Sequence, residues 1–189
     1  MAWWNIGRRK RETVTTSWLG EKLAEGFYPA QTLQMVGGWH HLPADSPMPF
    51  LALASLHVAG VRIGCNQESI MRRVDQHIIV KVHHSLVAAL VDKYANAHKP
   101  EPEPRALIPR LFDVANRVTD AFYTNANSKP PLPLPHWYAG KELCLFLLNG
   151  KGVPNPEEVM TYAEYLSVSI RATKQFLDGL LAADVALIE

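Results

Sequence analysis

Apolar residues recur at every fourth position through residues 66–99, the longest stretch of the chain without proline or glycine. Residues four apart lie on one side of an α-helix, so this pattern predicts a long helix over about residues 67–98. The opposite side of that helix is mostly polar and is expected to face water. A helix with so broad an apolar side must be covered by other elements along most of its length. The apolar side consists of Ile70, Val74, Ile78, Val82, Leu86, Leu90 and Tyr94.

A second long helix is predicted over residues 156–187. Asn155 can cap its first turn, and Pro156 fits the first helical position. Apolar residues then recur at spacings of three and four as far as Leu187, with polar residues on the other side. Gly179 interrupts this helix, which suggests a close helix contact or a local bend at that point.

Shorter segments with helical spacing lie between stretches rich in proline and glycine. They predict helices at residues 14–25, 29–36, 50–59 and 136–150, and one that begins at Pro104 or Pro109 and keeps its apolar spacing from Leu111 to Phe122. A chain of 189 residues that is 48% hydrophobic can bury one sizeable core. We therefore predict an all-α fold, in which residues 13–189 form a single-domain helical bundle around the two long helices.

Two segments leave an α+β fold open as the alternative. Residues 56–64 combine alternating apolar residues with two glycines, and residues 77–82 are rich in β-branched side chains, so the two could pair as a small sheet. We favour helix at 77–82, because the helical spacing continues on both sides of this segment without a turn signal. At 56–64 we expect the end of a helix followed by a loop.

Charge and cysteine content narrow the class of protein. The formal net charge is +1, so no overall field directs the chain toward nucleic acid or acidic substrates. Cys65 and Cys144 lie far apart in the sequence, which fits a reducing compartment better than a disulfide framework. No apolar run approaches the about 20 residues that span a bilayer. We expect a cytoplasmic protein, or one peripheral to a membrane, with no transmembrane span.

The first 12 residues form a basic and aromatic arm ahead of a nearly neutral body. Tryptophan and clustered cations favour the surface of an anionic membrane, and they can also stack on bases and neutralise phosphates. The arm could equally be a frayed terminus, or its tryptophans could pack onto the body. The residues that would make a contact with a partner or membrane are Trp3, Trp4, Arg8, Arg9, Lys10 and Arg11.

Eight histidines call for a search for metal ligands, but neither an HExxH nor a Glu-x-x-His pattern occurs. His77 and His84 are seven residues apart, about 10 Å along a helix, and so cannot share one ion. His83 lies among apolar residues and is expected to be buried. His40 and His41, in a loop bounded by Trp and Pro, and His57 remain as candidates to line a pocket or hold a ligand. We predict no metal and no cofactor.

Signals for nucleophilic catalysis are equally weak. Cys65 precedes the predicted long helix, and a thiol near a helix N-terminus can have a lowered pKa. The motifs GxSxG, GxGxxG and GxxxxGK[ST] do not occur, so no residue is assigned a catalytic role. We therefore favour a non-enzymatic helical protein that acts by binding another protein or by self-association. The alternatives are attachment to a membrane or nucleic acid through residues 2–11, and an enzyme or small-molecule receptor with a histidine-lined pocket.

Overall fold

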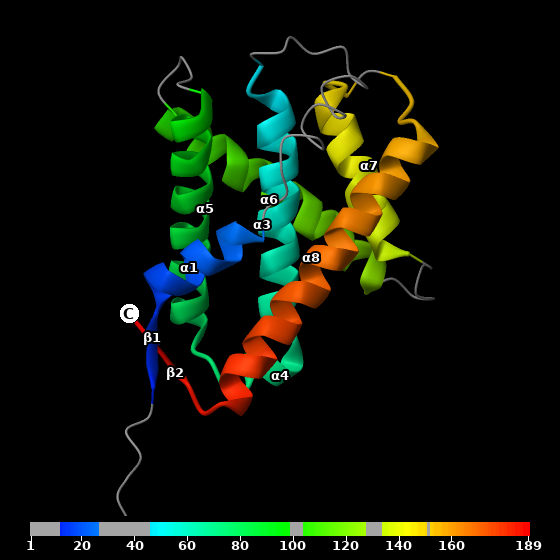
Figure 1. The fold of residues 1–189 in the computed structure, drawn as a ribbon. Helices are drawn as coiled ribbons and strands as arrows, with labels where there is room; N and C mark the ends of the chain where they lie inside the picture. The colour runs from blue at the N-terminus through cyan, green and yellow to red at the C-terminus, as the bar shows by residue number, and fades with distance from the viewer. Residues whose placement is uncertain (1–11, 27–45, 99–103, 128–133, 151) are drawn as a thin grey trace, which may run out of the picture.

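The computed structural model describes residues 12–26, 46–98, 104–127, 134–150 and 152–189. These residues form an all-α bundle with one very small sheet (Figure 1), which confirms the predicted fold class. The helix predicted at 29–36 and the arm at residues 1–11 lie outside the described residues.

The centre of the bundle is α3, Met48–Cys65, and not the helix after it as the sequence pattern suggested. Every residue of α3 except Met48 and Arg62 is buried. It packs against α8, Pro156–Ala182, along one side and against α6, Leu107–Ala126, along another (Figure 1). Other elements cover α3 on nearly all sides, which explains why apolar residues occupy nearly all of its positions.

By length and apolar composition alone, α3 meets the requirement for a helix that crosses a membrane. In the bundle, 83% of the 18-residue window is buried by the other elements. The core helix of a globular protein has the same two properties, so its hydropathy is accounted for by its place in the bundle.

Two glycines one helical turn apart allow α3 and α8 to approach closely. A Cβ atom added at Gly60 would lie 2.5 Å from Cβ of Ser169, and one added at Gly64 would lie 2.8 Å from Cβ of Thr173. Neither distance is possible between real carbon atoms, so both positions require glycine at this helix spacing. The loop predicted after residue 59 is therefore wrong, because these glycines continue the helix to Cys65 and serve to pack it.

A second glycine contact joins α1, Thr16–Glu25, to α5, Gln76–His98. A Cβ atom at Gly20 would lie 2.5 Å from Cβ of Ser85 and 2.7 Å from the backbone nitrogen of Leu86. The longer helices of the bundle thus fall into two sets: the α1–α5 pair, and the α3–α8 group, which consists of α3, α6, α7 (Pro135–Leu147) and α8. In Figure 1, α5 stands on the left with α1 across it, and α3, α7 and α8 lie to the right.

The long helix predicted at 67–98 is divided in two, as α4, Glu68–Met71, and α5. The turn between them preserves the apolar spacing, because Ile70 and Val74 are both buried on the same side of the chain. Asp75 precedes the first residue of α5, a position that its side chain favours, and its carbonyl accepts from the N–H of Ile79. Spacing alone therefore could not reveal the break.

The C-terminal helix also ends earlier than predicted, at Ala182 and not at 187. Asp184 has φ of 57°, and the N–H of Val185 donates to the carbonyl of Leu180 at 3.2 Å, as in a Schellman motif. Its start is as predicted, since the side chain of Asn155 accepts from the N–H of Glu157 at 3.0 Å.

The residues beyond this turn form β2, Ala186–Ile188, which pairs in parallel with β1, Thr13–Thr15. Val14 lies opposite Leu187, so two residues assigned to helices from the sequence are in strands. The alternative α+β arrangement is wrong, because 56–64 lies in α3 and 77–82 lies in α5. The remaining connection includes the short 3₁₀ helix Pro104–Ala106.

Candidate functional site

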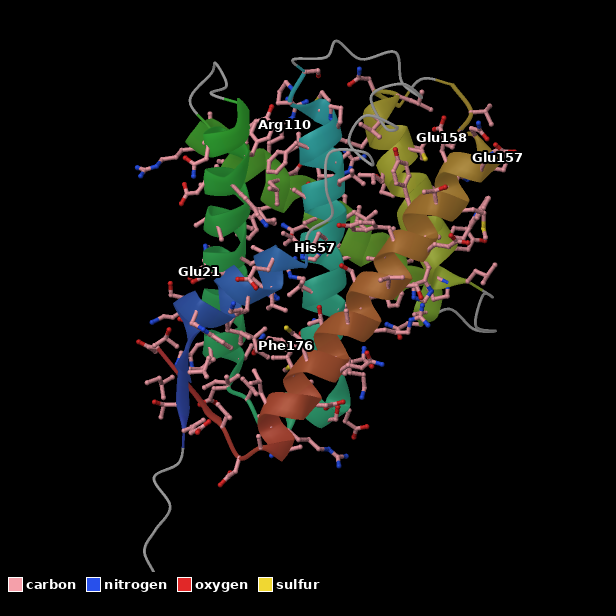
Figure 2. All side chains as sticks on the ribbon, in the orientation of Figure 1. Glu21, His57, Arg110, Glu157, Glu158 and Phe176 are labelled. Carbon is pink, nitrogen blue, oxygen red and sulfur yellow. The ribbon has the colours of Figure 1, made fainter. Side chains whose placement is uncertain are left out.

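A pocket of about 170 Å³ lies between α1 and α8, with α3 as its floor. We call it the α1–α8 pocket. His57 lies between α1 and α8 in Figure 2, and Phe176 lies farther toward the C-terminal end of α8. The lining residues are Leu23 and Gly26 at the end of α1, His57 of α3, and Tyr165, Val168, Ser169, Ala172, Thr173 and Phe176 of α8.

His57 connects three helices through its two ring nitrogens. Nε2 lies 2.9 Å from the carbonyl oxygen of Leu23, which can only accept, so Nε2 carries the proton and donates. Nδ1 is then free to accept from the hydroxyl of Ser169, whose Oγ is 2.8 Å away. Burial, with a smaller contribution from the nearby Lys93 ammonium, lowers the pKa of His57 to about 4 despite the hydrogen bond to Leu23, so the ring is neutral at pH 7.

This contact between a serine and a histidine raises the question of acyl transfer. A histidine whose pKa is about 4 is a weak base at neutral pH. Ser169 is only 6% exposed and lies inside α8, where backbone N–H groups are bound within the helix and cannot form an oxyanion hole. The bonds of His57 therefore serve to hold α1, α3 and α8 together, and the geometry around Ser169 does not favour acyl transfer.

The rim of the α1–α8 pocket is apolar and partly open. Trp18 of α1 is 38% exposed and stacks on Phe176 with ring centroids 6.4 Å apart, and Lys22 lies over the same indole ring. Val168 is 42% exposed beside the pocket. An exposed tryptophan and valine at the edge of a preformed apolar pocket are features of binding surfaces.

Only one of the residues proposed from the sequence is found at this site. His57 lines the pocket, whereas His40, His41 and the arm residues Trp3, Trp4, Arg8, Arg9, Lys10 and Arg11 lie outside the described residues. His57 therefore remains a candidate, and none of the described residues that line its pocket is an acid.

The other histidines that the structure describes, and the cysteines, form no cluster. His77 contacts Glu189, with Nε2 and Oε1 3.2 Å apart, while His84 lies against the ring of Phe112. Within the part of the chain that the structure describes, no three His, Cys, Asp or Glu residues are placed to share a metal ion.

Cys65 is not the activated thiol that the sequence allowed. It is the last residue of α3 and not a residue before the N-terminus of α5, and it is buried. Burial raises its pKa to about 12, so the thiol remains protonated and unreactive at neutral pH. The pKa of the buried Cys144 is raised to about 12 in the same way, with Glu158 nearby adding to the effect.

Sequence reasoning did not identify Tyr165, Ser169 or Phe176 as part of a site. One signal could have found Ser169: the pair Gly60 and Gly64 and the pair Ser169 and Thr173 share a spacing of four residues. Small residues at this spacing on two helices mark a close crossing, and His57 lies one turn before the first glycine.

No protein-family model, no curated protein and no solved structure matches this chain.

Proposed function

We propose that this protein acts by binding another protein, whose apolar side chain fills the α1–α8 pocket. The observation that carries this proposal is the pocket itself, preformed between two helices and bordered by exposed apolar residues. Apolar cavities of about 150 Å³ hold a single benzene molecule. A volume of about 170 Å³ therefore suits one leucine or one aromatic ring of a partner.

The polar groups of the pocket floor favour an apolar occupant. Both ring nitrogens of His57 are engaged, one with Leu23 and one with Ser169. A polar ligand would have to displace one of these bonds to gain its own, whereas an apolar side chain leaves both intact. Anchors of this kind, surrounded by less important contacts, supply most of the affinity in many protein interfaces.

Two valines of similar exposure provide a matched test. Val168 borders the pocket at 42% exposure, and Val80 lies on α5 at 46% exposure. The full chain and the variants Val168→Asp and Val80→Asp would each be used as bait, with bound proteins quantified by mass spectrometry. We expect a protein that binds the wild type and Val80→Asp to be recovered at least about tenfold less with Val168→Asp.

Equal recovery with all three baits would contradict the proposal. Thermal melting of the three proteins serves as a second measurement. Both substitutions place a carboxylate at an exposed helical site, so we expect similar melting temperatures. A large fall for Val168→Asp alone would mean that the surface around Val168 is covered in the free protein, which would also overturn the proposal.

The other functions considered from the sequence have less support. His57 is the one histidine among the described residues that line the pocket, and its weak basicity gives little support to an enzyme built on this ring. Attachment to a membrane or nucleic acid through residues 2–11 stays a prediction, as do self-association and a cytoplasmic location.

A further inference from the structure

The α1–α5 pair and the α3–α8 group meet along a surface that we call the seam. It includes the stacked rings of Phe50 and Tyr94, 4.2 Å apart, and the contact between His84 and Phe112. The two described histidines that are buried, His57 and His83, also lie on this seam, one from each side. The seam therefore concentrates the side chains whose charge changes most readily between pH 4 and 7.

His57 reaches across the seam from α3 to α1. Its bond to the carbonyl of Leu23 joins the two sets of helices, while its bond to Ser169 stays within the α3–α8 group. Among the described residues, the ionisable groups that face it are Lys93 of α5, whose Nζ donates to the carbonyl of Ala24 at 3.3 Å, and Tyr165 of α8, whose ring centroid is 6.4 Å away.

His83 approaches the same seam from α5. It is 5% exposed, and within the described residues its Nε2 has no hydrogen-bond partner. The charged or ionisable groups that act on it are Arg62 of α3 and His84 of α5, and Arg62 in turn donates to the side chain of Asn116 on α6. Burial, and after it the Arg62 guanidinium and the neighbouring His84, disfavour a proton on His83.

Both histidines are thus neutral in the closed bundle, and a charge on either would lie buried beside a cation. An isolated buried charge is far more costly than a buried neutral ring, so protonation favours a state in which the rings reach water. At one end of the seam, other bonds do not depend on these rings: β1 pairs with β2, and Glu189 binds Lys81 at 2.7 Å. That end can hold the two sets of helices together while the rest of the seam opens.

We infer that the seam is an acid-sensitive joint: protonation of His57 and His83 separates the α1–α5 pair from the α3–α8 group before the individual helices unfold. The opened state exposes the apolar side of α3 that α1 and α5 cover. In the closed state the pKa of each histidine is about 4, against the ordinary 6.5 once the ring reaches water. At pH 5, each histidine therefore raises the opening constant roughly 30-fold.

Amide hydrogen exchange of the full chain at pH 7.5 and pH 5.0, corrected for the pH dependence of the chemical exchange rate, measures this opening. We expect faster exchange in peptides from α1 and α5 at pH 5.0, with exchange in α7 unchanged. Exchange that rises equally in all helices, or in none, would overturn the inference.

Variants test whether the faster exchange at pH 5.0 depends on the imidazole rings of His57 and His83. The amide of His57→Gln can donate to Leu23 and accept from Ser169 but cannot be protonated, so we expect it to reduce the acid effect roughly 30-fold. His83→Met removes the second ring with a flexible apolar side chain and should act similarly, which keeps the test valid if one variant fails to fold. His136→Gln is the control, because His136 lies on α7 away from the seam, and it should behave as the wild type. An undiminished acid effect in both seam variants contradicts the inference.

Discussion

Replacing Gly20 with alanine tests the closest helix contact of the α1–α5 pair. The added Cβ would lie 2.5 Å from Cβ of Ser85, 2.7 Å from the nitrogen of Leu86 and 2.8 Å from the carbonyl carbon of Ser85. These atoms belong to the backbone or to the first carbon of a side chain, so no rotation of a side chain can relieve the clash. Carbon atoms in contact need about 3.5–4 Å, so the two helices must move apart by roughly 1 Å.

The expected change in the free energy of unfolding for Gly20→Ala follows from two opposing effects. Overpacking of this kind typically costs about 1–3 kcal/mol of stability. We expect a cost near the upper end of this range, because the backbone must move and the separated helices lose contacts. Alanine in a helix gains about 1 kcal/mol over glycine. We expect a net loss of about 2 kcal/mol, which lowers the melting temperature by roughly 4–8 °C for a chain of this size.

Gly179→Ala is the matched control for this substitution. It makes the same change inside a helix, but a Cβ atom at Gly179 meets nothing within 4 Å. We expect it to stabilise the protein by roughly 0.5–1 kcal/mol. Urea denaturation and thermal melting of both variants give the comparison. If Gly20→Ala is as stable as Gly179→Ala, the packing of α1 on α5 described above is incorrect.

Three further predictions concern the stability of the fold. Gly64→Ala, whose Cβ would lie 2.8 Å from Cβ of Thr173, should lower the free energy of unfolding by about 1–3 kcal/mol in urea. Asn155→Ala, which removes the cap of α8, should lower it by about 1 kcal/mol. Stability should be full above pH 6.5 and fall as the pH drops toward 4, by about 2–3 kcal/mol at pH 4.5 for each of His57 and His83, because the unfolded chain binds protons that the buried rings do not. Urea melts of the wild type at pH 7.5 and 4.5 measure this loss, and equal stability at both would contradict the neutral state of the two rings.

The helices were predictable where spacing and end signals agree. Asn155 and Pro156 mark the start of α8, and Asn149 with Gly150 marks the end of α7. The break before α5 was not predictable from spacing, because Ile70 and Val74 preserve the apolar row across a turn. Leu187 fits a helical row in the same way, although it lies in a strand.

The glycines show the limit of sequence reasoning most directly. Gly179 was expected to mark a close helix contact or a local bend, and the contact is absent because a Cβ atom there meets nothing within 4 Å, whereas Gly20, Gly60 and Gly64 lie at crossings. A glycine has the same effect on a sequence pattern whether or not a neighbour approaches it. The pocket was unpredictable for the same reason, since Leu23, His57 and Ser169 come together only when three helices cross.

The burial of nearly all of α3 has a consequence during synthesis. Its covering helix α8 begins some 90 residues after α3 ends. At translation rates of about 5–20 residues per second, the nascent chain waits roughly 5–20 s before α8 emerges from the ribosome. Throughout that interval an 18-residue apolar segment lacks its partner. We expect residues 48–65 to be the main site at which chaperones hold the growing polypeptide.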